Sequence, residues 1–170
     1  MERVIIIGSC GAGKSTFAAK LAKKLGLPLV HLDRLRFIGN WVERPREEFD
    51  EMLMRELEKQ RWIIDGNYNR TIPLRMRYCD TVIFLDFPRL LCLWRVIKRV
   101  TRYHGKTRPD MGDNCPERFD LEFMKYVWQF RKKHRKRYLE MLSKAKDKNV
   151  VILRNPRQAE DFLKKFETEN

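Results

Sequence analysis

Residues 8–15 fit the phosphate-binding loop pattern G-x-x-x-x-G-K-[ST] at every fixed position. The loop follows residues 4–7, a β-branched run typical of a strand buried on both faces. It precedes residues 16–25, whose apolar side chains recur at helical spacing. This context constrains the chain strongly, because the glycines let backbone N–H groups converge on phosphate oxygens at the positive end of the helix.

We expect the whole loop to bind the phosphates of a nucleotide, through Gly8, Ser9, Cys10, Gly11, Ala12, Gly13, Lys14, Ser15 and Thr16. Lys14 is expected to reach the β- and γ-phosphates and to act in catalysis, and Ser15 to ligate Mg²⁺. Thr16 is expected near the α- and β-phosphates. ATP and Mg²⁺ are therefore the predicted cofactors. The alternative is an ordinary glycine-rich turn that leaves Lys14 in solvent.

The charge of the chain favours an anionic partner. With 37 Lys and Arg residues against 23 Asp and Glu residues, the formal net charge is +14. On this ground the partner is a nucleotide, a nucleic acid or an acidic membrane. Residues 89–148 hold 18 basic and seven acidic side chains, so most of the excess lies in a segment through which nucleic acid could bind.

Other classes of protein are disfavoured. The four cysteines form no C-x-x-C pair and few histidines accompany them, so neither a disulfide framework nor a zinc site is indicated, and we expect a cytoplasmic location. We find no secretory signal and no apolar run near about 18 residues, so we expect neither translocation nor a membrane partner. A length of 170 residues predicts a single domain over 1–170.

Strand patterns and helix patterns alternate along the rest of the chain. The expected strands are residues 27–33, 62–65, 81–86 and 150–153. The expected helices are residues 46–60, a segment that begins at Pro88, residues 117–143 and a segment that begins at Pro156. We therefore predict an α/β fold with a doubly wound, five-stranded parallel sheet of the P-loop type.

Two carboxylates come at the ends of expected strands, where ligands bind in open α/β sheets. Asp33 is a candidate for binding a substrate hydroxyl or a Mg²⁺-bound water, unless it only caps the loop to Arg34. Asp65, followed by Gly66, is a candidate for orienting Mg²⁺ through water. Trp41 lies in an exposed turn, either as a hydrophobic staple for the next helix or as a cover over substrate, and both readings stay open.

Arginines and one long loop complete the candidate site. Arg70 and Arg75 are expected to clamp an anionic substrate in forked pairs, with a solvated surface as the alternative. Residues 104–116 carry glycines and prolines and are long for a loop in a compact domain, which is typical of a lid. We expect a lid-like insertion at about residues 99–137.

The order and spacing of several motifs resemble a bacterial family of topology modulation proteins, which are small adenylate-kinase-like P-loop proteins. The motifs are residues 8–15, 31–33, 62–68, 81–86 and 108–111. The resemblance covers nearly the whole chain. It implies a fold of the nucleoside and adenylate kinase type and ATP binding, whereas the family name implies an effect on DNA topology without identifying a reaction.

The resemblance also implies site residues. Arg95 and Arg99 resemble the paired arginines that begin the adenylate kinase lid. Arg131 and Arg135 resemble the second half of that lid, and the resemblance implies that they contact the substrate. Residues 154–156 are similar in place to the loop that contacts adenine, so Arg154 and Pro156 are expected to bind the nucleotide.

One departure from adenylate kinases bears on the acceptor. Those enzymes follow Asp-Gly with Phe-Pro-Arg, which grips the acceptor phosphate, whereas this chain has Asn67-Tyr68-Asn69-Arg70. A hydroxyl acceptor is helped by a carboxylate that takes its proton, and Asp33 offers one. Shikimate and gluconate kinases resemble this arrangement more closely.

Three functions follow from these patterns. The favoured one is an ATP-dependent phosphotransferase in which Lys14, Arg95 and Arg99 neutralise the transferring phosphoryl group and Asp33 acts as base, with a small hydroxyl-bearing acceptor rather than a nucleoside monophosphate. The second is an ATP-dependent DNA-binding protein that modulates DNA topology, with Tyr126, Trp128 and Phe130 either stacking on bases or packing in the core. The third is an ATP-bound interaction module without turnover.

Overall fold

A computed structural model of the protein describes residues 1–166. Its strands are β1 (Arg3–Gly8), β2 (Leu29–His31), β3 (Trp62–Asp65), β4 (Thr81–Leu85) and β5 (Asn149–Leu153). They form one five-stranded sheet in the order β2-β3-β1-β4-β5, and every neighbouring pair is parallel. The predicted doubly wound α/β fold is confirmed.

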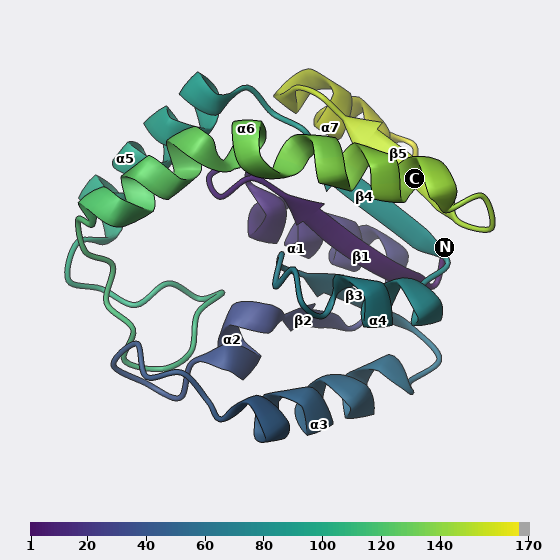
Figure 1. Cartoon of the computed structure of the whole chain (residues 1–170), viewed down its shortest axis with the longest axis horizontal. Coiled ribbons are helices and arrows are strands. Elements are labelled where there is room, and N and C mark those ends of the chain that lie inside the picture. Colours follow the sequence, from purple (N-terminus) through teal and green to yellow (C-terminus); the bar gives the residue numbers. More distant parts are fainter. Residues whose placement is uncertain (167–170) are drawn as a thin grey trace.

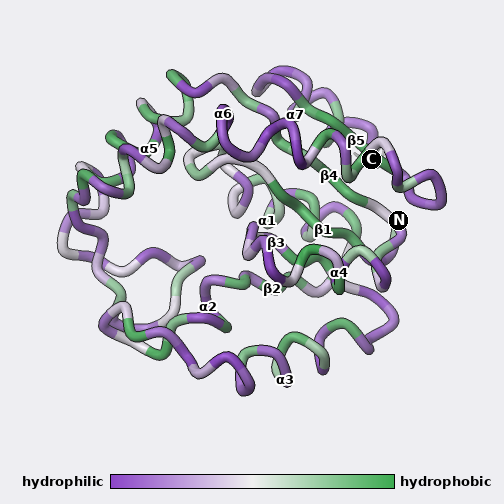
Figure 2. Tube along the Cα trace, viewed as in Figure 1, coloured by the Kyte–Doolittle hydropathy of each residue, from purple (hydrophilic) through white to green (hydrophobic). Residues whose placement is uncertain are grey.

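Helices cover both faces of the sheet (Figure 1). Alternate residues of β1 enter opposite cores, because successive side chains of a strand point to opposite faces. On one face lie α1 (Lys14–Leu25), α5 (Arg89–Tyr103) and α7 (Pro156–Lys164). On the other face lie α2 (Leu32–Arg36), α3 (Arg46–Leu57) and α4 (Ile72–Tyr78). Figure 2 shows hydrophobic residues concentrated in the strands and hydrophilic residues along much of α6.

Helix α6 (Leu121–Lys144) is the longest helix among the described residues and serves both cores. Met124 and Val127 pack with α1 and α5, whereas Phe130, Tyr138 and Leu142 pack with α3 and α4. No helix within residues 1–166 has the length and apolar character needed to span a bilayer.

Several predicted element boundaries were wrong, among them the end of the helix expected at 46–60, which is Leu57, and one helix was missed. The strand expected at 27–33 is only β2, and Asp33 lies in the first turn of α2, because the buried Leu32 starts a helix as soon as this edge strand ends. The segment before β4, for which no helix was predicted, forms α4 around the buried Ile72. Helix α6 begins at Leu121 rather than at residue 117, since Glu117 still pairs with His104 in the preceding loop.

The loop between α5 and α6, residues 104–120 and here called the lid loop, packs against residues 37–42 far away in the sequence (Figure 1). The backbone N–H of Asn40 donates to the carbonyl of Asn114 at 2.7 Å, and Trp41 Nε1 donates to the carbonyl of Pro116 at 3.0 Å. A Cβ at Gly112 would lie 2.2 Å from the carbonyl oxygen of Phe37, so only glycine permits this approach. The two loops therefore close over the carboxyl edge of the sheet together.

Candidate active site

A cavity of about 740 Å³ opens at the carboxyl edge of the sheet. The P-loop, α1 and α5 line one part of it, and α2, Tyr68 and the lid loop line another. Parallel strands bring their carboxyl ends to this edge, and the register of β2 on β3 pairs His31 with Asp65. Residues that are distant in the sequence thus meet in one space.

The P-loop is curled around its own lysine. Lys14 Nζ donates to the carbonyl oxygens of Gly8 at 3.1 Å and Ser9 at 3.2 Å. Gly11 and Gly13 have φ of 80° and 90°, a conformation that favours glycine, and a Cβ at Gly11 would lie 2.2 Å from the Cys92 carbonyl oxygen. A loop of this shape at the start of α1 fits a phosphate chain.

Most of the predicted nucleotide ligands line the cavity. They are Cys10, Gly11, Ala12, Gly13, Lys14, Ser15, Thr16, Arg95, Arg99 and Pro156. Arg95 Nη1 donates to the carbonyl of Ala12 at 3.0 Å, so this guanidinium lies directly on the P-loop. Gly8 and Ser9, the first two residues of the loop, are buried, and the backbone N–H of Gly8 donates to Asn67 Oδ1 at 3.0 Å. Arg154 is exposed, and its backbone N–H donates to Gln158.

Two oxygen-bearing side chains could hold Mg²⁺. Ser15 and Asp65 both line the cavity, and hard cations prefer such ligands. Asp65 is buried, with a ring nitrogen of His31, Nδ1, 2.8 Å from its Oδ1. Despite burial, the hydrogen bond and charge of Asp65 raise the pKa of His31 above its ordinary value. The donor set of hydroxyl, carboxylate and phosphate oxygens fits this ion.

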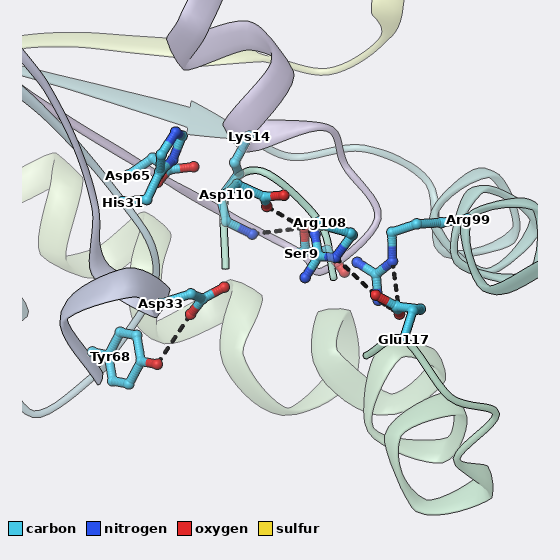
Figure 3. A network of polar contacts seen from close by, with 10 residues as sticks. All are labelled: Ser9, Lys14, His31, Asp33, Asp65, Tyr68, Arg99, Arg108, Asp110 and Glu117. Atoms are coloured by element: carbon cyan, nitrogen blue, oxygen red, sulfur yellow. Dashed lines mark hydrogen bonds and ion pairs between the residues drawn. The ribbon is translucent and has the colours of Figure 1, made fainter. Parts of the chain in front are cut away.

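Asp33 faces the cavity with a partner that sequence reasoning missed (Figure 3). Tyr68 Oη donates to Asp33 Oδ1 at 3.0 Å. Burial, reinforced by the charge of Asp65, raises the pKa of Asp33 although the Tyr68 hydrogen bond acts in the opposite direction. Tyr68 itself has a φ of 32°, a strained value for a bulky residue, which its packing on Phe49 helps to maintain.

The lid loop contributes a second polar network (Figure 3). Arg99 donates through Nε and Nη2 to Glu117 Oε1 at 3.0 and 2.7 Å. Arg108 forms ion pairs with Glu117 at 2.7 Å and with Asp110 at 2.8 Å. Sequence reasoning noted residues 108–111 only as a motif, so the roles of Arg108, Asp110 and Glu117 were missed.

Arg70 and Arg75 do not form the predicted substrate clamp. Arg70 lies at the surface and donates two hydrogen bonds to Asp50 of α3, at 2.7 and 2.8 Å. Arg75 is fully buried, and its guanidinium binds the backbone carbonyls of Gly66 and Asn67. Burial lowers the pKa of Arg75 to about 10, which leaves it protonated at neutral pH. Its role in the fold is to satisfy the backbone after β3.

Arg131 and Arg135, which were predicted as the second half of the lid, are not among the residues that line the cavity. Arg131 and Arg135 reach back from α6 to Asp86 at the end of β4, at 3.4 and 2.9 Å. The Asp86 side chain is buried, so it requires these cations. Trp41, for which two readings were open, packs edge-to-face on Phe37 and lines the cavity.

Fold and site together define a doubly wound α/β architecture with a phosphate-binding loop at the carboxyl edge of its sheet. A model of the ATPase family associated with various cellular activities (AAA) matches residues 4–86, which include the P-loop, Asp33 and Asp65. The fold matches shikimate kinase from Acinetobacter baumannii in complex with shikimate, with a TM-score of 0.61, 17% identity and coverage of 97% of this chain and 90% of that one. Shikimate kinase from Bacteroides thetaiotaomicron gives a TM-score of 0.60, 20% identity and coverage of 96% and 95%.

A protein that is similar in sequence is also named as a shikimate kinase. Shikimate kinase of Enterococcus faecalis (strain ATCC 700802 / V583) is 39% identical to this chain over 62 residues, which is 35% of this chain and 37% of that protein. The alignment thus spans little more than a third of the curated relative's length. The likeness to the solved structures establishes the fold across nearly the whole chain.

Proposed function

We propose that this protein is an ATP-dependent phosphotransferase that moves the γ-phosphate of ATP to a hydroxyl group of a small molecule. The observation that carries the proposal is the presence of Asp33, a half-buried carboxylate held by Tyr68, in the same cavity as the P-loop lysine Lys14. The kinases similar to this chain act, by their names, on shikimate, which is a hydroxyl-bearing acid.

The proposed reaction assigns one task to each group. The acceptor oxygen attacks the γ-phosphorus, the bond from that phosphorus to the β,γ-bridging oxygen breaks, and ADP leaves. The hydroxyl proton passes to Asp33, whose raised pKa makes it a stronger base than an ordinary aspartate. Lys14, Arg95 and Arg99 neutralise charge on the phosphoryl oxygens. The lid loop excludes water from the reacting groups.

Mg²⁺ is assigned to Ser15 and Asp65. When bound, it would neutralise charge on the phosphate oxygens. His31 keeps the Asp65 carboxylate in place through the Nδ1 to Oδ1 contact of 2.8 Å.

A hydroxyl acceptor accounts for Asp33 better than a nucleoside monophosphate does. The phosphate of a monophosphate is already anionic at neutral pH and needs no base, whereas an alcohol must lose a proton as it attacks. The alternative function on DNA receives no support from the related proteins, and two arginines of its basic segment are engaged by Asp86.

An acceptor screen tests the proposal. ADP release is measured with the full chain, ATP and Mg²⁺ against sugars, alcohols, nucleosides, nucleotides and small acids, with Lys14→Ala as the inactive control and the surface variant Arg70→Ala as the matched active one. We expect one class of alcohol to raise ADP release in the wild-type and Arg70→Ala proteins only. ADP release that never exceeds the Lys14→Ala background would contradict the proposal.

A further inference from the structure

The partners of the arginines restrict the charge of the acceptor. An acceptor with a carboxylate or phosphate requires cations to receive it. The arginines predicted for that task are engaged elsewhere: Arg70 by Asp50, Arg75 by backbone carbonyls, and Arg131 and Arg135 by Asp86. None of these four arginines is among the residues that line the cavity.

We call the part of the cavity that holds Asp33 the acceptor end and define it by the lining residues Asp33, Phe37, Trp41, Tyr68, Asp110 and Met111. Arg108 is the arginine that adjoins it, and both Asp110 and Glu117 neutralise its guanidinium. The other basic side chains that line the cavity come from α1, α5 and Arg118, which follows the Arg99 partner Glu117. All of them except Arg118 belong to α1 and α5, the helices to which the phosphates of ATP are assigned.

Of the carboxylates that line the acceptor end, Asp110 is paired with Arg108, whereas the hydrogen bond to Asp33 comes from the uncharged Tyr68 hydroxyl. Asp65 acts electrostatically on Asp33, and Lys14 and Arg108 act in the opposite sense. An anion brought into this partly enclosed space would meet the Asp33 carboxylate at reduced dielectric.

Aromatic rings supply the remaining surface. Phe37 and Trp41 pack edge-to-face with centroids 5.3 Å apart, and Tyr68 packs on Phe49 at 5.4 Å. The hydrogen bond from Trp41 to the Pro116 carbonyl fixes the indole against the lid loop. Such rings accept the apolar body of a ligand and attract ammonium groups through their faces.

We propose that the acceptor is an alcohol without negative charge and with an apolar or planar body, and that the site prefers an amine-bearing alcohol to a hydroxy acid. The inference rests on the proposed function, since it names the substrate class of the same cavity. It also separates this chain from proteins that phosphorylate an acid such as shikimate, whose fold it shares.

Three probes that differ mainly in charge test the inference. They are 4-(aminomethyl)benzyl alcohol, 4-(hydroxymethyl)benzamide and 4-(hydroxymethyl)benzoate, which present the same benzylic hydroxyl on the same ring. Binding to the full chain is titrated by protein NMR, with and without ATP and Mg²⁺. We expect the amine to bind at least about tenfold more tightly than the benzoate, with the amide between them.

Matched variants separate the local charge from the overall charge. Asp110→Asn removes one carboxylate from the acceptor end and loosens Arg108, so the ratio of benzoate to amine dissociation constants should fall about threefold. Asp50→Asn makes the same change of charge outside the cavity and should leave the ratio unchanged. A benzoate that binds as tightly as the amine, an amine that does not bind, or equal effects of the two variants would overturn the inference.

The outcome can be told apart from a failure of the proposed function. Titrations without nucleotide measure the order of the probes whether or not ATP binds or reacts. If the amine binds most tightly but no acceptor stimulates ADP release in the screen, the preference against negative charge is supported and phosphotransfer is contradicted. ADP release that hydroxy acids alone stimulate would sustain phosphotransfer and overturn the charge assignment.

Discussion

The phosphate end and the acceptor end of the cavity are built in different ways. The phosphate end is built around one continuous segment, residues 10–16, whose shape comes from glycines at positive φ and from backbone groups, with Arg95 of α5 against it. The acceptor end draws side chains from α2, from residues 37–41, from Tyr68 and from the lid loop. The core of the first is therefore a property of local sequence, and the second exists only when three distant stretches, residues 32–41, Tyr68 and the lid loop, are packed together.

The two ends differ in how narrowly they define their ligand. Backbone N–H groups recognise any phosphate chain, so the phosphate end defines a broad class of ligand. Side-chain charge and shape at the acceptor end would decide which second molecule is accepted, because a carboxylate repels an anion and an aromatic ring favours an apolar body or an ammonium group. Changes at the acceptor end should alter the choice of acceptor and leave nucleotide binding intact.

The largest predicted effect is that of Asp33→Asn. Loss of the proposed base should lower kcat by about 10²–10⁴-fold, while the dissociation constant of ATP stays within about twofold of the wild-type value. Steady-state kinetics with a confirmed acceptor and calorimetric titration of ATP measure the two quantities. Equal losses of turnover and ATP affinity would mean that the two ends are not separable.

Arg75→Met should have the next largest effect, and on stability rather than on specificity. The substitution leaves buried carbonyls of Gly66 and Asn67 without their donor, which costs about 3 kcal/mol in the free energy of unfolding. Chemical denaturation followed by circular dichroism measures the loss. An unchanged stability with a raised acceptor KM would instead assign Arg75 to the substrate.

Tyr68→Phe should shift the dependence of activity on pH. Asp33 acts as base only when deprotonated, so activity falls as pH drops through its pKa, which burial and Asp65 raise. The Tyr68 hydrogen bond favours the carboxylate, and Lys14 and Arg108 act in the same direction. Removal of the Tyr68 hydroxyl should therefore move the acid limb of the kcat/KM profile to higher pH.

The measurement compares the pH profile of kcat/KM of Tyr68→Phe with that of the wild-type protein. We expect the variant to be several-fold less active at acid pH and to recover wild-type activity at high pH. A uniform loss at every pH would show that Tyr68 serves only as packing against Phe49.

Arg70→Ala should have the smallest effect. The pair of Arg70 with Asp50 is exposed, and exposed pairs contribute about 0–1 kcal/mol. Stability should change by less than about 1 kcal/mol and the acceptor KM should be unchanged. A large rise in the acceptor KM would return Arg70 to the substrate site and weaken the contrast between the two ends.

Sequence reasoning performed best where function depends on contiguous residues. The P-loop needs a fixed spacing of glycines and one lysine, and the sheet needs short β-branched runs, so both could be predicted. It performed worst for arginines, because the partner of a long charged side chain is decided by distant residues. Arg131 meets Asp86 across 45 positions, and Arg99 meets Glu117 only because the lid loop folds back on α5.

By itself, the amino-acid sequence determined that a phosphate-binding loop joins a buried strand to a helix and that a parallel sheet carries it. Those features follow from local periodicity and from backbone freedom at glycine. Only the tertiary structure decided which charges remain for a second substrate, because ion pairing depends on distances between segments that the sequence keeps far apart. Asp33 depends on both: the sequence indicated a role from its position after β2, and the tertiary structure places Tyr68 and the lid loop around it in the cavity.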